Sequence, residues 1–149
     1  MTVRIRDAGS GEAGTILEAY EWLFEPPGRR PPRWDAERAR AALAAAIDSP
    51  DSAVLVAEES GALVGFCTAY MTLESVRFGR RCWVEELAVH PDRRSEGIGA
   101  RLLSDARAWA AERGATHLKL DSSVDRTDAQ RFYERERPAW RSISYSWEL

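Results

Sequence analysis

Apolar residues recur along this chain with two different periods, and the shorter period predicts strands. Val3 and Ile5 alternate with arginines, which is the pattern of a strand that buries one face. Five further segments have strand-like patterns: residues 53–58, 62–71, 82–89, 117–121 and 142–148. Ser60 and Gly61 separate the first two of these, which predicts a hairpin. In the last segment, serines alternate with large apolar residues, which predicts a half-buried strand.

The longer period, with apolar residues three and four apart, predicts helices. Four segments show it: one after Ser10, one after Asp35, one from Ile98 to Gly114 and one from Thr127 onward. Ser10 and Asp35 are residue types that cap helix N-termini, and Gly114 suits a C-terminal cap. Thr127 and Gln130 have the spacing of a capping box, which predicts that the last helix begins there.

The predicted order is strand, two helices, three strands, helix, strand, helix and strand. This order is typical of an α/β domain in which a mixed central sheet is flanked by about four helices. The 149 residues match the size of one domain, and no repeat or composition shift divides them. Prolines and a glycine between Pro26 and Pro32 predict a shaped loop between two helices. We therefore expect residues 1–149 to form a single domain.

Composition and charge exclude several classes of protein. The net charge of −3 argues against a general nucleic-acid binder, which carries a basic face. No apolar run reaches the length of a signal peptide or the roughly 20 residues of a membrane span. We therefore expect a soluble, cytoplasmic protein. Cys67 and Cys82 lack the spacing of metal ligands, so we expect two free thiols and no metal site.

A loop after the predicted strand 82–89 has the features of an anion site. Val89 ends the strand, and a helix begins near Gly97 and Gly99. The first N–H groups of a helix have no internal partners, and its dipole places partial positive charge there. Glycines let the backbone approach a phosphate closely, and Arg93 and Arg94 add charge. The spacing fits neither the dinucleotide-binding fingerprint nor the P-loop.

The pattern Arg94-x-x-Gly97-x-Gly99 resembles the acetyl-CoA loop of GNAT (Gcn5-related N-acetyltransferase) enzymes. The similarity extends over residues 84–103, and AQRFYER at residues 129–135 resembles the second conserved block of that family. The alternative interpretation is a helix that opens with glycines and binds nothing. The resemblance implies a GNAT-like fold and acetyl-CoA as cosubstrate. It also implies a homodimer, because many relatives dimerise.

The resemblance also implies which residues hold the coenzyme. Leu87, Ala88 and Val89 would pair with the pantetheine arm through their backbone, and the Leu87 N–H would stabilise the oxyanion. The phosphates would lie on the loop and helix start, namely Arg94, Ser95, Glu96, Gly97, Ile98, Gly99 and Ala100. The family's asparagine before the second block is missing here. Either Asp125 replaces it or that contact is lost.

Transfer of an acetyl group to an amine requires a base. An amine with a pKa of about 10.4 is neutral in only about one molecule in a few thousand at pH 7. Glu85 and Glu86 are the candidates, and adjacent strand residues point to opposite faces, so only one should face the reaction. The resemblance points to Glu85, and a bulge that shifts the strand's phase would favour it over Glu86. The alternative is that both are surface charges.

Tyr133 matches the family tyrosine beside the coenzyme sulfur, where its phenol would protonate the leaving thiolate. The alternative is a core tyrosine packed on Phe132. The family's Gly-Phe turn after this block is also missing, and Trp140 would fill the phenylalanine position.

Three aromatic residues, Trp22, Phe24 and Trp34, flank the proline-rich loop. In the family this region shapes the acceptor pocket, so they would line it together with Glu85; packing in the core is the alternative. The resulting hypothesis is acetyl transfer to the primary amine of a small molecule, by direct attack in a ternary complex. Two alternatives stay open: acetylation of protein N-termini or lysines, and a non-catalytic acyl-CoA sensor.

Overall fold

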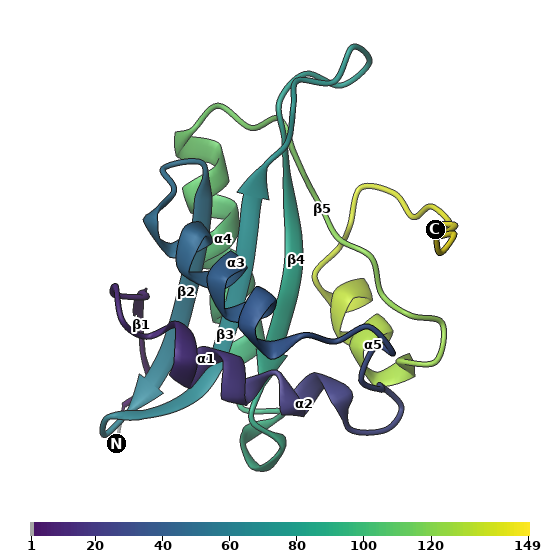
Figure 1. Ribbon diagram of the computed structural model, residues 1–149. Coiled ribbons are helices and arrows are strands. Elements are labelled where there is room, and N and C mark those ends of the chain that lie inside the picture. Colours follow the sequence, from purple (N-terminus) through teal and green to yellow (C-terminus); the bar gives the residue numbers. More distant parts are fainter. Residues whose placement is uncertain (1) are drawn as a thin grey trace.

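The computed structural model describes residues 2–149, which fold around one five-stranded sheet (Figure 1). The strands, in spatial as well as chain order, are β1 (Arg4–Asp7), β2 (Ser52–Glu59), β3 (Ala62–Met71), β4 (Arg81–Val89) and β5 (His117–Lys119). The helices are α1 (Ala13–Ala19), α2 (Glu21–Phe24), α3 (Ala36–Asp48), α4 (Ile98–Glu112) and α5 (Thr127–Arg135), with a 3₁₀ turn at Pro91–Arg93. Neighbouring strands are antiparallel except for β4 and β5, which are parallel. The predicted mixed α/β fold is therefore confirmed.

Helices cover both faces of the sheet and bury one apolar cluster on each. On one face α4 packs Ile98, Leu102 and Ala106 against the strands. On the other face α1 and α3 cover a second cluster that includes Ile16 and Phe66. Figure 1 shows α1 and α3 on the near side of the sheet and α4 behind it. The helical spacing of the residues from α1 and α4 predicts their place in the core, and Phe66 enters it from β3.

Three of the predicted chain reversals and helix ends are confirmed. Ser60 and Gly61 both have positive φ, 52° and 79°, as a two-residue hairpin turn between right-twisted strands requires. The Asp35 carboxylate accepts a hydrogen bond from Arg38 N at 3.2 Å and so caps α3. Gly114 has φ of 79° directly after the end of α4.

Two predicted caps are wrong, because neither Ser10 nor Thr127 stands at the cap position of its helix. Ser10 does not cap α1, which begins after Glu12. The Glu12 carboxylate instead accepts the Gly9 N–H at 2.6 Å and binds an arginine of β1. Thr127 does not cap α5 either, because Arg126 occupies the cap position. The Gln130 side chain donates to the Ser123 carbonyl at 2.7 Å and takes no part in a capping box.

The predicted strand over residues 142–148 is also wrong. This segment pairs with no strand, and Ile143, Tyr145 and Trp147 are 77%, 74% and 79% exposed. Side-chain hydrogen bonds hold it instead, such as Ser144 Oγ to Asp121 Oδ1 at 2.6 Å. Alternation reports that a segment has two faces, but it does not supply the neighbouring strand that a ladder needs. Across residues 2–149, no helix has both the length and the apolar character to cross a membrane.

Arg6 of β1 ties the start of α1 to β2. Its guanidinium contacts Glu12 at 2.7 and 3.0 Å and Glu58 at 3.1 Å. The hydrogen bond from Arg6, followed by that from the Gly9 N–H, lowers the pKa of Glu12 to about 2. The pKa of Glu58 is also lowered, mainly by Arg6. A carboxylate whose pKa is lowered by folding stabilises the folded state at pH values above its unfolded pKa of about 4.3. This stabilisation is lost as the pH falls through the pKa of the folded state.

Arg6→Gln is therefore expected to lower the free energy of unfolding at pH 7, with a difference from wild type that shrinks from pH 5 to pH 2. Urea denaturation at pH 7, 5 and 3 measures this. Arg4→Gln is the control, because Arg4 forms an ion pair with Glu58 and its side chain is more exposed than that of Arg6. A difference that stays constant over this range would contradict the assignment.

Candidate active site

One edge of β4 is unpaired over the half that leads to the glycine-containing loop. Pairing with β5 covers only Arg81 to Trp83. Beyond that point the chain leaves β4 and leads from β5 toward α5 (Figure 1). The predicted coenzyme-binding residues Leu87, Ala88 and Val89 lie on this unpaired half, while their other edge pairs with β3. A free strand edge presents backbone N–H and C=O groups to an extended ligand.

A β-bulge at Glu85 decides which side chains of β4 face the core. Val84 pairs with Ala69 and Glu86 pairs with Thr68, so Glu85 has no partner on β3. Without the bulge, Val84 and Glu86 would share a face. With it, Val84 packs in the cluster under α4, while Glu86 and Thr68 lie on the opposite face. The bulge that the family resemblance implies is therefore present in β4.

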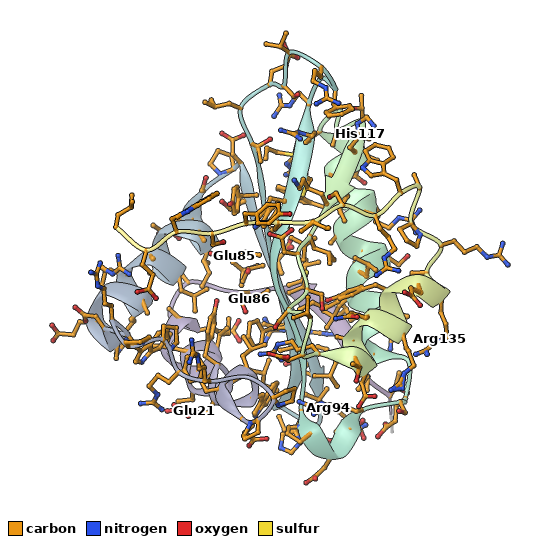
Figure 2. All side chains as sticks on the ribbon, turned by 90° about the vertical axis from the view of Figure 1, so that its right-hand side faces the viewer. Glu21, Glu85, Glu86, Arg94, His117 and Arg135 are labelled. Atoms are coloured by element: carbon orange, nitrogen blue, oxygen red, sulfur yellow. The ribbon has the colours of Figure 1, made fainter. Side chains whose placement is uncertain are left out.

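The two glutamates lie side by side in different environments (Figure 2). Glu85 is exposed, and Glu86 is partly buried with its N–H donating to Thr68 Oγ1 at 3.1 Å. Burial, followed by the negative charge of Glu85, raises the pKa of Glu86 to about 7, and Arg126 opposes this rise. The role of either residue as base stays a prediction, and the raised pKa of Glu86 suits it to proton transfer near neutral pH.

Tyr133 of α5 lies close to the same carboxylate. Burial, with smaller contributions from Cys67 and Glu86 and against the effect of Arg126, raises the pKa of its phenol to about 12. Its ring packs on Phe132, with centroids 5.1 Å apart. The phenol therefore stays protonated at neutral pH and is a proton donor. Both the catalytic role and the core-packing alternative are compatible with this placement.

Tyr20 and Arg126 belong to this cluster, and sequence reasoning assigned a role to neither. The Tyr20 hydroxyl interacts with Thr68, and burial followed by the charges of Glu86 and Glu85 raises its pKa. Its position in the apolar stripe of α1 gave only a core signal. Arg126 precedes α5 and acts electrostatically on Glu86. A lone arginine in a loop carries no distinguishing signal in the sequence.

Two of the three predicted acceptor-site aromatics contact each other directly, and the third is joined to them through the rings of Phe66 and Tyr20. Trp22 packs on Phe66 at 6.2 Å and on His90 at 5.1 Å between ring centroids. Phe24 and Trp34 contact each other edge to face at 4.9 Å. Trp22 is therefore partly a core residue, and the other two form the wall of the proline-rich loop. Their contact with an acceptor stays a prediction.

The loop before α4 has the backbone shape of an anion site. Ser95 and Gly97 have positive φ, 64° and 82°, which turns successive N–H groups to one side. No side chain of residues 2–149 caps α4, so its first N–H groups stay available. Gly99 lies beside α5, because a Cβ at this position would be 3.6 Å from the Phe132 ring.

The two arginines of the loop differ in availability. Arg93 binds Glu59 at 2.6 Å and Glu96 at 3.0 Å, so its charge is already paired. Arg94 is exposed and bonds the Val89 carbonyl through Nε at 3.4 Å. The expectation that both arginines serve an anion is therefore corrected: Arg94 is the available cation. Asp125, expected in place of the family asparagine, is exposed in the turn before α5.

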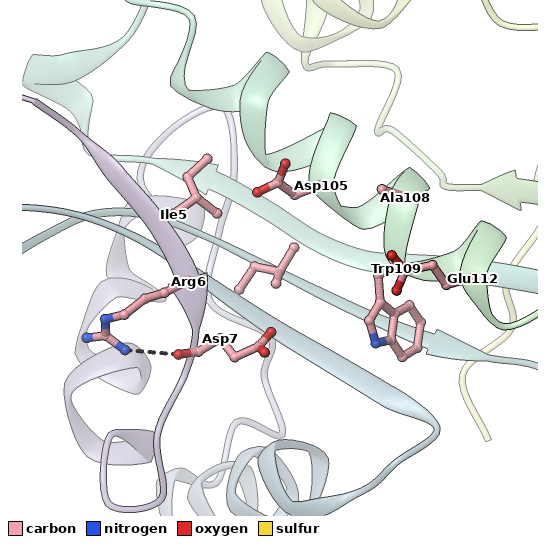
Figure 3. Close-up of a pocket in the computed structure, with 8 residues that line it drawn as sticks. Ile5, Arg6, Asp7, Asp105, Ala108, Trp109 and Glu112 are labelled. Atoms are coloured by element: carbon pink, nitrogen blue, oxygen red, sulfur yellow. Dashed lines mark hydrogen bonds between the residues drawn. The ribbon is translucent and has the colours of Figure 1, made fainter.

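A separate shallow hollow lies on the opposite face of the sheet, between β1 and α4 (Figure 3). Its lining includes Ile5 and Trp109, which pack against the cluster under α4. Glu86 lies on the other face, so this hollow is not part of the candidate site.

Comparison with known proteins decides the family. The model of the acetyltransferase (GNAT) family matches residues 16–137, which include both sequence blocks and β4. The chain belongs to the GNAT acetyltransferase family. It is accordingly an enzyme of the acyltransferase class, and the resemblance found in its sequence is confirmed.

The relatives of this GNAT chain include N-acetyltransferases of different specificity. It is 37% identical to the uncharacterized N-acetyltransferase YhfO of Bacillus subtilis, over 89% of this chain and 87% of that protein. It is 31% identical to the aminoalkylphosphonate N-acetyltransferase of Salmonella typhimurium, over 68% and 66%. The fold matches the aminoglycoside N-acetyltransferase AAC(6')-Iy in complex with CoA, with a TM-score of 0.82, 18% identity and coverage of 99% and 96%.

Proposed function

We propose that this protein transfers the acetyl group of acetyl-CoA to the primary amine of a small molecule, by direct attack in a ternary complex. The observation that carries the proposal is Glu86, a partly buried carboxylate with a pKa raised to about 7. It lies at the unpaired edge of β4, within electrostatic reach of Tyr133. Membership in the GNAT family supports acetyl transfer as the chemistry.

In the proposed reaction, Glu86 accepts a proton from the ammonium form of the acceptor. The neutral nitrogen attacks the thioester carbonyl carbon, and the new C–N bond forms as the C–S bond breaks. The Tyr133 phenol gives its proton to the departing thiolate, and the proton that the new amide nitrogen loses restores the phenol through solvent. A base with a pKa near 7 is efficient because it is partly ionised at working pH and still binds a proton well. The Leu87 N–H is the proposed donor to the oxyanion.

Acetyl-CoA is the cosubstrate that this geometry fits. The turned N–H groups at Ser95 and Gly97, with exposed Arg94, suit a pyrophosphate. The free edge of β4 suits the amide groups of the pantetheine arm, as an added strand. The relative AAC(6')-Iy has been solved with CoA, which supports the same ligand here.

A small, cationic amine is the proposed acceptor. Glu85 and Glu86 place two carboxylates at one point of β4, which favours a positively charged substrate. Relatives named as aminoalkylphosphonate and aminoglycoside N-acetyltransferases support a small amine as the acceptor. Protein acetylation and an acyl-CoA sensor are the competing outcomes of the test.

Calorimetric titration with acetyl-CoA, followed by thiol release against small amines and peptides, tests the proposal. Binding and turnover on small amines are expected. Arg94→Gln should weaken binding, whereas Arg107→Gln, an exposed control on α4, should not. Turnover on peptides alone would favour protein acetylation, and binding without turnover would favour the sensor. Absence of binding would overturn the proposal.

A further inference from the structure

The side chain of Arg126 joins two helices that are distant in the sequence. Its Nη2 donates to the Leu23 carbonyl of α2 at 2.8 Å. Arg126 itself immediately precedes α5, the helix that carries Tyr133. This one hydrogen bond therefore fixes the aromatic wall around α2 to the start of α5.

The loop after α2 is shaped around this guanidinium. The Gly28 N–H donates to the Glu25 carbonyl at 2.7 Å and closes a tight turn. A Cβ on Gly28 would lie 1.9 Å from the Leu23 carbonyl oxygen and 2.4 Å from Arg126 Nη2. Any side chain at this position would displace the loop backbone, the arginine or both. The glycine is thus required by the contact, although its own φ is not positive.

Arg126 is also the cation among the charged groups that surround Glu86. Glu85 faces Glu86 from the bulge of β4, Tyr20 from the end of α1 and Tyr133 from α5. Of these groups, Arg126 alone favours the ionised forms: it opposes the rise of the pKa of both Glu86 and Tyr133. The clamp that holds the loop therefore also brings a positive charge to the reacting carboxylate.

We propose that Arg126 is a positioning residue of the acetyl-transfer site, which fastens the acceptor-side loop to α5 and places one positive charge beside Glu86. The inference rests on the proposed function for its catalytic consequence. The structural half, the charge beside Glu86, is independent of whether Glu86 acts as the base.

Carboxyl NMR of the protein without ligand tests the charge directly. The Glu86 signal is identified by its absence from Glu86→Gln, and its titration is followed in wild type, Arg126→Gln and the control Arg131→Gln. Arg131 lies on α5 and pairs with Asp128. The Glu86 titration should move to higher pH in Arg126→Gln only. An unmoved titration would overturn the inference, whatever the enzyme does.

The kinetic profile tests the positioning. In Arg126→Gln, the acid limb of kcat/KM should move to higher pH. For each pH unit that the limb moves, kcat/KM on its acid side should fall about tenfold. Arg126→Lys keeps the charge but lacks the planar fork, so it should keep the limb and raise KM for the amine. A limb and a KM that both stay unchanged in these variants would contradict the clamp.

Gly28→Ala tests the clamp without changing any charged residue. It should raise KM for the amine as Arg126→Lys does, whereas Gly14→Ala on α1, where a Cβ would be 3.4 Å from Arg40, should not. Thermal denaturation confirms that both variants fold. If Glu86→Gln keeps full activity, the proposed base is wrong, and the NMR titration still decides the inference. If Glu86→Gln is inactive while the Arg126 variants behave as wild type, the inference alone fails.

Discussion

Glu86→Gln is expected to lower kcat/KM for the amine acceptor by about 10²–10⁴-fold and to leave acetyl-CoA binding unchanged. The amide keeps the size and position of the carboxylate but cannot accept the ammonium proton. Because Glu86 must be ionised to act, wild-type kcat/KM should fall as pH drops through about 7, the value to which burial raises its pKa. Thiol release measured from pH 5.5 to 9, with calorimetry for acetyl-CoA, checks both parts.

Glu85→Gln is the matched control for this prediction. Glu85 is exposed on the bulge, so Glu85→Gln should change kcat less than tenfold. The acid limb of the pH profile should move to lower pH, because one negative charge next to Glu86 disappears. A severe loss in Glu85→Gln together with an active Glu86→Gln would reverse the two roles and restore the preference that the sequence gives.

Phe66→Ala is expected to cost about 3–5 kcal/mol of the free energy of unfolding. Phe66 is fully buried on β3, and its ring packs on Tyr20 at 5.1 Å and on Trp22 at 6.2 Å. Removing the ring leaves a cavity that the sheet and α1 cannot close fully. Urea denaturation measures the loss, and Tyr145→Ala, at an exposed position, should stay within about 0.5 kcal/mol.

Because Tyr20 reaches the Glu86 cluster, Phe66→Ala should also raise KM for the amine at temperatures where the variant is folded. Unchanged stability would show that the second apolar cluster repacks around the gap. If Leu102→Ala, in the cluster under α4, also left the stability unchanged, the burial assigned to both apolar clusters would be contradicted.

Local patterns determined those parts of the fold that are controlled locally. The helical stripe ending at Gly114 and the turn at Ser60 and Gly61 depend on side-chain spacing and on φ, which neighbouring residues set. Residues 142–148 show the limit, because a strand requires a partner that no local pattern supplies. The cap at Ser10 failed because Arg6 of β1 binds Glu12, the residue that stands at the cap position. The cap at Thr127 failed because Arg126 takes the cap position and the Gln130 side chain bonds the Ser123 carbonyl.

The sequence predicts which residues belong to the candidate site, but it does not predict which role each of them has. The glycine-containing loop and Tyr133 follow from motifs. The choice between Glu85 and Glu86 depends on burial, which two adjacent identical residues cannot reveal. Arg126 could not be found at all, because its importance comes from the carbonyl of Leu23 and from the missing side chain of Gly28 on the other side of the loop.

The exposed C-terminal segment also affects the intrinsic tryptophan fluorescence of the protein. Of the six tryptophans, Trp140 and Trp147 are 56% and 79% exposed, and the remaining four are partly buried: Trp22, Trp34, Trp83 and Trp109. Indole rings in water emit at longer wavelength than shielded rings and are reached by collisional quenchers such as iodide. The intrinsic fluorescence of the native protein therefore contains a quenchable, red-shifted component that belongs to the segment after α5, where Trp140 also contacts the rings of Phe78 and His117.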